Sequence, residues 1–166
     1  MSYDVLWEPW RLDYIRAANS QPDEGCFICR GTTASSDREN LVLRRGAQSV
    51  VILNRFPYNN GHLLVAPRAH KANLHELSQP EMLELTQTMA EMIQLLDQTI
   101  QPHGYNVGLN LGQVAGAGLP GHLHWHIVPR WGGDTNFMPV ISNSRVIVQS
   151  LESLYDLLQD RLRGEL

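Results

Sequence analysis

The chain has 166 residues, a usual length for one domain with its own hydrophobic core. Its 13 Lys and Arg against 17 Asp and Glu give a formal net charge of −4, which excludes the basic surface of a duplex DNA-binding protein. No apolar run approaches the roughly 20 residues of a membrane helix, and the N-terminus lacks the pattern of a signal peptide. Two cysteines make a poor disulfide framework. We therefore expect a cytoplasmic protein with reduced thiols that binds neither duplex nucleic acid nor membrane.

Five β-rich stretches alternate with turn signals along the chain. The expected strands cover residues 40–45, 48–53, 62–66, 105–111 and 122–128. Gly46-Ala47 predicts a hairpin turn between the first two, and the glycine-rich residues 112–121 join the last two. Before the first strand, residues 31–39 have the composition of a loop. We expect a single domain, residues 1–166, with an N-terminal extension over about residues 1–39.

Two helices are expected, one in the middle of the chain and one at its end. Ser78-Gln-Pro-Glu81 has the pattern of a capping box with proline in the first turn. Apolar side chains then recur at helical spacing as far as Ile100, before Pro102. The last helix is expected from about Val146 to Leu162. Strands in hairpin-like order with segregated helices indicate an α+β fold on an antiparallel sheet.

Three histidines, His122, His124 and His126, occupy alternate positions in the last expected strand. On a regular strand such side chains share a face, and each lies about 6.6 Å from the next. The outer two are then about 13 Å apart, which is too far for one metal ion to bind all three. At least one of them must therefore have a different role. A row with only a packing role is disfavoured, because buried polar rings are costly without partners.

The glycine-rich residues 112–121 lead directly into this histidine row. Glycines let backbone N–H groups turn inward around an anion without obstruction from side chains. A neutral imidazole is a competent nucleophile near pH 7, and amide donors aimed at phosphate oxygens stabilise a transferring phosphoryl group. The combination predicts nucleotidyl or phosphoryl transfer through a covalent intermediate on histidine.

The sequence His122-Leu-His-Trp-His-Ile-Val resembles the His-x-His-x-His signature, with apolar x, of the histidine triad (HIT) superfamily of nucleotide hydrolases and transferases. The resemblance covers roughly residues 40–140 and implies a HIT-like fold with an antiparallel sheet, a long amphipathic helix and a C-terminal helix. Further matching segments are Asn54–Pro57, Gly61–His70 and Asn106–Gly112. The segments similar to the bacterial branch that contains diadenosine tetraphosphate phosphorylases are Leu6–Arg11, Tyr14-Ile15, the longer glycine loop and Val128–Phe137.

The resemblance implies a role for each matching position. His124 would be the nucleophile that attacks the α-phosphate, and His126 would contact the phosphates and help the leaving group depart. The implied substrate contacts come from Asn54, Asn110, Gln113, Gly118 and Leu119. At Gly118 the chain offers only backbone where many relatives have a polar side chain. Family members are typically homodimers, and Mg²⁺ is expected only as a companion of the nucleotide substrate.

Cys26 and Cys29 have the spacing of half a zinc site, although redox pairs and unrelated thiols share that spacing. A structural zinc ion takes four nitrogen or sulfur ligands. Zinc-containing bacterial HIT proteins that resemble this chain have the ligands at the positions of Cys26, Cys29, His70 and His122. Zinc-free relatives use the counterparts of the two histidines in a hydrogen-bond network instead. Zn²⁺ at this site would leave His124 and His126 for chemistry.

The remaining candidates receive mainly structural interpretations. His62 is interpreted as structural or close to phosphate, with the structural role favoured, while His75 and His103 are expected to be solvated without a role. The tryptophans are interpreted as packing residues rather than adenine platforms; they are Trp7, Trp10, Trp125 and Trp131. The candidate donors for a second anion site are Arg130 and Asn136.

We therefore predict an enzyme that cleaves diadenosine tetraphosphate, or a related adenine nucleotide conjugate, through a covalent nucleotidyl-His124. Inorganic phosphate is the favoured acceptor, which would make it a phosphorylase, or ATP adenylyltransferase. Two alternatives stay open: a water-dependent hydrolase that releases AMP, and a zinc-stabilised nucleotide-binding module without turnover. A metallohydrolase built on the three histidines is disfavoured, because no Asp or Glu follows at ligand spacing.

Overall fold

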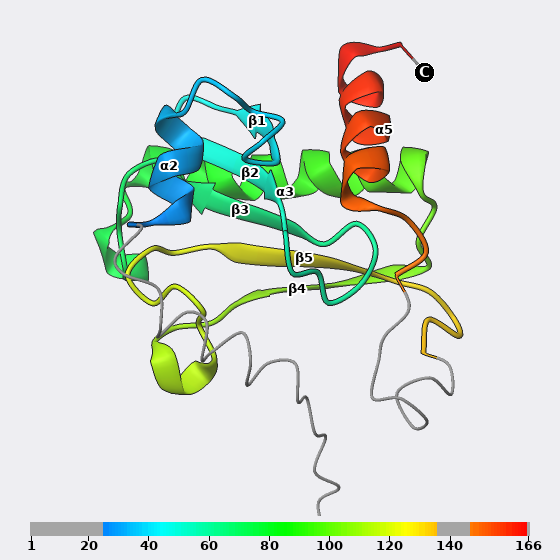
Figure 1. Cartoon of the computed structure of the whole chain (residues 1–166). Helices are drawn as coiled ribbons and strands as arrows, with labels where there is room; N and C mark the ends of the chain where they lie inside the picture. The colour runs from blue at the N-terminus through cyan, green and yellow to red at the C-terminus, as the bar shows by residue number, and fades with distance from the viewer. Residues whose placement is uncertain (1–24, 136–146, 166) are drawn as a thin grey trace, which may run out of the picture.

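A five-stranded antiparallel sheet forms the centre of the molecule (Figure 1). The computed structural model describes residues 25–135 and 147–165. The strands are β1 (Val42–Arg45), β2 (Ser49–Leu53), β3 (Leu63–Pro67), β4 (Gly104–Leu109) and β5 (Trp125–Arg130). Their order across the sheet is β1-β2-β3-β5-β4, and every neighbouring pair is antiparallel. The α+β fold expected from the sequence is confirmed.

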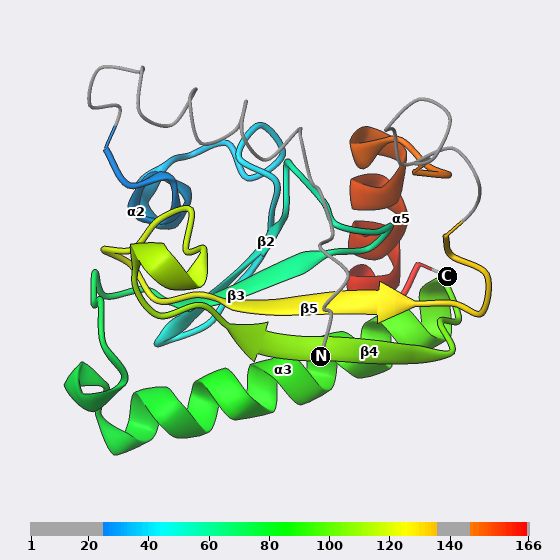
Figure 2. The same cartoon turned by 90° about the horizontal axis from the view of Figure 1, so that it is seen from below.

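Helices lie on both faces of this sheet. The long helix α3 (Gln79–Thr99) runs along one face, and the short helix α2 (Phe27–Thr33) lies on the other (Figure 2). Helix α5 (Leu151–Arg163) packs against α3 and β1. Two 3-10 turns, η1 (Leu74–Glu76) and η2 (Gln113–Ala115), lie in the connections. Within the two described ranges, no helix is long and apolar enough to cross a bilayer.

The register of the strands decides which side chains share a face. Ile52 pairs with Leu64, and Leu64 pairs with His126, so these three side chains point to the same side. This is the α2 side, because a Cβ added at Gly31 of α2 would lie 3.2 Å from Ile52 Cδ1. Trp125 lies at the next position along β5 and faces the α3 side. The histidine face and the α3 face are therefore distinct, as the alternation in sequence predicts.

The expected capping box begins α3. The Ser78 side chain accepts a hydrogen bond from the Glu81 N–H, and the Glu81 carboxylate accepts from the Ser78 N–H at 2.7 Å. Glu81 is buried, and Lys71 Nζ lies 2.7 Å from its carboxylate. Hydrogen bonds from Lys71 and Ser78 hold the pKa of Glu81 at about 2. The start of α3 is thus tied to the segment that follows β3.

The element boundaries differ from the sequence expectation at several ends. The strand expected over 40–45 begins at Val42, because Leu41 has a φ of 56°. The strand expected over 105–111 covers Gly104–Leu109. The last helix begins at Leu151 rather than near Val146, since Ser150 caps it by accepting from the Ser153 N–H. Val146 itself lies outside the described residues.

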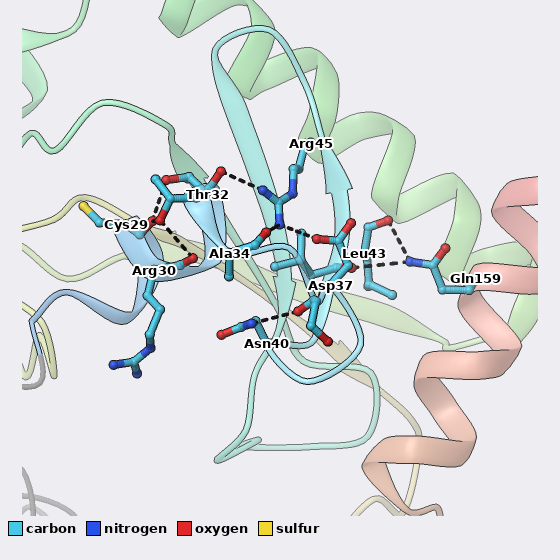
Figure 3. Close-up of polar contacts among 12 residues, drawn as sticks. Cys29, Arg30, Thr32, Ala34, Asp37, Asn40, Leu43, Arg45 and Gln159 are labelled. Atoms are coloured by element: carbon cyan, nitrogen blue, oxygen red, sulfur yellow. Dashed lines mark hydrogen bonds and ion pairs between the residues drawn. The ribbon is translucent and has the colours of Figure 1, made fainter.

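Helix α2 is an element that the sequence analysis missed, because part of it falls in the segment 31–39 expected as a loop. Arg45 on β1 holds its C-terminal end: Nη1 donates to the Thr32 carbonyl at 2.6 Å and Nη2 to the Ala34 carbonyl at 2.8 Å (Figure 3). Nη2 also pairs with Asp37. Seven residues are too few for a stable helix alone, so its position depends on these tertiary contacts and on the buried Ile28.

Candidate functional site

The histidine motif crosses the start of β5 instead of lying within it. The strand expected over 122–128 begins at Trp125, so His122 and His124 precede the ladder. The reason lies in Pro67 of β3, which has no N–H to donate. Its carbonyl accepts a hydrogen bond from the His122 side chain at 2.8 Å. His122 therefore lies outside the regular strand for which the even spacing was assumed.

Four side chains from three segments converge beside this point. Their ligand atoms all lie within 4.8 Å of one another, and they belong to Cys26, Cys29, His70 and His122. Nδ1 of His122 is 3.2 Å from Cys26 Sγ, and Nδ1 of His70 is 3.2 Å from Cys29 Sγ. The structure thus brings together all four predicted metal ligands. Two thiols and two imidazoles form a donor set that could hold a metal ion.

The hydrogen bonds of His122 fit this role. Because a carbonyl can only accept, the bond to Pro67 places the ring proton on Nε2. Nδ1 then presents its lone pair toward the two sulfur atoms, which is the form in which imidazole binds a metal. Burial lowers the pKa of His122, and this also favours the neutral ring. His122 is buried, and the geometry positions its ring from both nitrogens.

Burial and a hydrogen bond with Cys26 raise the pKa of the Cys29 thiol to about 11 in the absence of a cation. A bound cation reverses this preference, because it favours the thiolate. The two thiols lie at the start of α2, where the Cys29 N–H points to Cys26 Sγ at 3.4 Å. The donor set therefore fits a metal that binds sulfur.

His124 follows two residues later and is held through one nitrogen. Its Nδ1 donates to the main-chain carbonyl of His122 at 2.9 Å. Among the residues that the structure describes, Nε2 of His124 has no hydrogen-bond partner. Burial lowers the pKa of His124, although the bond to the carbonyl opposes this effect. The ring is consequently neutral at pH 7, and its Nε2 presents a lone pair.

His126 forms a pair with His62, which the sequence analysis assigned mainly a structural role. His62 Nε2 lies 2.9 Å from His126 Nδ1, and the two ring centroids are 5.1 Å apart. The His62 ring is fully buried. Burial, with smaller repulsion from His126 and His124, lowers the pKa of His62 to about 3. His62 is therefore neutral, and it contacts the histidine motif through His126.

The proton positions in this pair follow from two donors on the 54–62 connection. The Tyr58 N–H donates to His62 Nδ1 at 3.0 Å, and the Asn54 amide lies 3.1 Å from the same nitrogen. Nδ1 of His62 must then accept, so its proton is on Nε2 and is donated to His126 Nδ1. The neutral His126 ring thus has its own proton on Nε2. Tyr58 was missed from sequence, because its contribution here is a backbone N–H.

The family model of the HIT domain matches residues 36–133, and these include the whole sheet and the histidine motif. This chain belongs to the HIT domain family.

Two curated relatives of this HIT protein have names that describe reactions of nucleotides. An AP-4-A phosphorylase of Mycobacterium tuberculosis (strain ATCC 25618 / H37Rv) is 41% identical over 158 residues, covering 92% of this chain and 81% of that protein. An asymmetrical bis(5'-nucleosyl)-tetraphosphatase of Schizosaccharomyces pombe is 28% identical over 125 residues, covering 75% of this chain and 68% of that protein. Similarity to the phosphorylase therefore extends well beyond the matched domain, into both ends of the chain.

Two solved structures share the fold of this chain. A Zn-bound histidine triad family protein from Mycobacterium smegmatis superposes with a TM-score of 0.66 at 22% identity, covering 85% of this chain and 95% of that one. A diadenosine triphosphate hydrolase from Plasmodium falciparum gives a TM-score of 0.63 at 15% identity, covering 93% of this chain and 98% of that one. The HIT fold is thus shared by proteins of low sequence identity.

The remaining predicted substrate contacts lie in the loop between β4 and β5. The Asn110 side-chain amide donates to the Gly116 carbonyl at 3.4 Å, so Asn110 braces the loop. Gln113 lies in η2 and is exposed, as is Gly118. Leu119 packs partly against the core, and its carbonyl accepts from the His122 N–H at 3.4 Å. The loop is thereby anchored next to the histidine motif, and Gln113 and Gly118 are exposed to solvent.

Arg130, predicted as a donor to a second anion, is bound within the protein. Its Nε donates to Asp134 at 2.6 Å and its Nη1 to Asn106 at 2.8 Å. The guanidinium holds the pKa of Asp134 at about 2. Asp134 also accepts from the Asn59 side chain at 2.9 Å. This network joins the end of β5 to the turn that contains Tyr58.

The other aromatic and histidine residues behave as packing or bracing groups. Trp125 is partly buried against the core, and Trp131 Nε1 donates to the Gln101 carbonyl at 3.2 Å. His103 Nδ1 accepts from the Gly132 N–H at 2.9 Å, and His75 is exposed. Trp7, Trp10 and Asn136 lie outside the described residues.

Proposed function

We propose that this HIT protein is a diadenosine tetraphosphate phosphorylase that works through a nucleotidyl-His124 intermediate. The observation on which the proposal rests is the hydrogen bond of His124 Nδ1 to the His122 carbonyl, because it leaves the Nε2 lone pair for attack on phosphorus. Burial favours the neutral, nucleophilic ring at pH 7. Similarity to a phosphorylase over 92% of the chain supports the choice of substrate.

In the first step, His124 Nε2 attacks the α-phosphorus of the substrate. A nitrogen–phosphorus bond forms, the bond to the bridging oxygen breaks, and its electron pair stays on the departing ATP. His126 lies beside His124, with ring centroids 5.0 Å apart, and its Nε2–H is a donor for the oxygen that leaves. In the second step, a phosphate oxygen attacks the same phosphorus, the nitrogen–phosphorus bond breaks with its electron pair returning to His124 Nε2, and ADP is released.

The backbone of the loop and nearby amides would hold the phosphates. Gln113, Gly118 and Leu119 follow Asn110 on the loop that ends at His122, and exposed amide groups there suit phosphate oxygens. Asn54 contacts His62 in the structure, and a substrate ribose or phosphate would share or replace that bond. Mg²⁺ enters this proposal only as a companion of the polyphosphate.

We further propose that Cys26, Cys29, His70 and His122 hold zinc. The support is the donor set: the ligand atoms of two cysteines and two histidines lie within 4.8 Å of one another, and such a set is typical of structural zinc sites. When bound, zinc supplies structural cross-linking and no chemistry. His122 then holds its own main-chain carbonyl in place for His124.

The products identify the acceptor. With diadenosine tetraphosphate and saturating phosphate, we expect ATP and ADP in equal amounts, separated by chromatography. AMP as the sole product besides ATP would mean that water is the acceptor and would place this chain among the hydrolases, as the tetraphosphatase relative suggests. Binding without any product would favour the nucleotide-binding module. A homodimer and a cytoplasmic location are further expectations from the family resemblance, and light scattering tests the first.

A further inference from the structure

Tyr58 contacts both histidines of the His62–His126 pair. Its ring centroid lies 4.8 Å from that of His62 and 5.8 Å from that of His126, with only 23° between the planes of the Tyr58 and His126 rings. Its backbone N–H donates to His62 Nδ1 at 3.0 Å. One residue therefore fixes the proton of His62 through the main chain and covers the face of His126 with its side chain.

The turn that contains Tyr58 is held in place from two directions. The Asn59 side chain donates to the Pro129 carbonyl at 3.1 Å and to Asp134 at 2.9 Å. Gly61 has a φ of +76°, and a Cβ there would lie 2.6 Å from Ile100 Cδ1. The turn thus has a close-packed conformation that is fastened to the end of β5.

We propose that Tyr58 is a positioning residue for His126, a role that rests on the proposed function. The stacked ring restricts rotation of the imidazole, so the Nε2–H of His126 stays aimed at the leaving oxygen. In the first step the electron pair of the broken phosphorus–oxygen bond ends on that oxygen, and no proton needs to move. The hydrogen bond from His126 stabilises this growing charge, and its contribution increases with the basicity of the leaving oxygen.

The test compares two leaving groups on the same nucleotide. If His124 is the nucleophile, the phenyl and p-nitrophenyl esters of AMP would both nucleotidylate it, and single-turnover release of the phenol would measure that step alone. Tyr58→Leu should lower the rate about tenfold with the more basic phenyl ester and about twofold with the p-nitrophenyl ester. Tyr58→Phe keeps the ring and should stay within about twofold of the wild type with both esters.

A purely structural role would give a different pattern, with equal losses on the two esters or a lowered unfolding temperature in Tyr58→Phe as well. Either result, or a Tyr58→Leu variant as fast as the wild type, overturns the proposal. Nitrogen NMR of the imidazoles gives a readout without turnover. The wild type and Tyr58→Phe should show one Nε2–H form of His126, whereas in Tyr58→Leu, which keeps the backbone N–H to His62, a His126 ring that rotates out of its bond with His62 should give an averaged signal. If the wild type reacts with neither ester, the proposed function fails, and the NMR comparison alone decides the role of Tyr58.

Discussion

His122 and His124 are two residues apart and both buried, yet their rings have different partners. Both nitrogens of His122 face protein groups, the Pro67 carbonyl on one side and the two thiols on the other. Within residues 25–135 and 147–165, His124 is held through Nδ1 alone, by the carbonyl of His122. A ring held at both nitrogens can only position, whereas a ring held at one nitrogen can react. This difference fits our proposal that His122 is a scaffold residue and His124 the reaction centre.

The strongest test of this division is to remove the reactive ring. His124→Asn deletes the nucleophile and keeps the loop, so turnover should fall by about 10³-fold or more, while nucleotide affinity changes little. His126→Asn should cost less, about 10²-fold, because it removes a donor and leaves the nucleophile. Steady-state kinetics together with calorimetric binding would measure both effects. A His126→Asn variant more damaged than His124→Asn would reverse the roles along the motif.

Removing a ligand that His122 shares in the proposed zinc site should lower the stability of the protein before it affects activity. Cys29→Ser removes one ligand of the proposed zinc site, so elemental analysis should show loss of the one zinc per chain expected in the wild type. The free energy of unfolding should fall by several kcal/mol, on the order of 3–5, because a bound structural metal contributes directly to folding. Ser35→Ala, at an exposed position after the same helix, is the matched control and should change neither quantity. Wild-type protein purified without chelator but free of zinc would contradict the assignment.

The pH dependence of the free energy of unfolding tests a third histidine, His62, apart from His122 and His124. Its pKa is about 3 in the folded protein and near 6.5 when unfolded, so the unfolded chain binds the extra proton between these values. The contribution is present above pH 6.5 and is lost as the pH falls toward 3, by an amount on the order of a few kcal/mol. Urea unfolding at pH 7.5 and pH 5 should show a smaller drop in His62→Gln than in the wild type. Exposed His75→Gln is the control, and an unchanged drop in His62→Gln would refute this account.

The smallest effect is expected at Arg130, beyond the reaction centre. Its guanidinium is already bound to Asp134 and Asn106, and the Arg130 side chain is half exposed. Arg130→Met should therefore change the free energy of unfolding by less than about 1 kcal/mol. It should also raise the KM for phosphate by less than about threefold. A large, selective rise in that KM would instead make Arg130 a donor to the acceptor phosphate, as the sequence analysis proposed.

Much of the fold follows from local patterns that the sequence displays directly. The capping box at Ser78 and the apolar period after it predict α3, because both signals act within a few residues. The β-rich stretches around Gly46 predict the β1–β2 hairpin, which the Gly46 N–H closes through the Ser49 carbonyl at 2.8 Å. The four candidate metal ligands were also predicted from sequence, although through resemblance rather than spacing alone.

Tertiary contacts decided where β5 begins, how α2 is held and which ring nitrogens carry protons. The start of β5 depends on Pro67, far before Trp125 in the chain, whose missing N–H and occupied carbonyl end the ladder. The position of α2 depends on contacts with Arg45, and the proton on His62 depends on a backbone N–H at Tyr58. The sequence by itself determined which side chains have the chemistry, because residue type and period are local. Which nitrogens of His122 and His126 are held, and by what, was decided only when distant segments packed together, since these hydrogen-bond partners are a property of the folded chain.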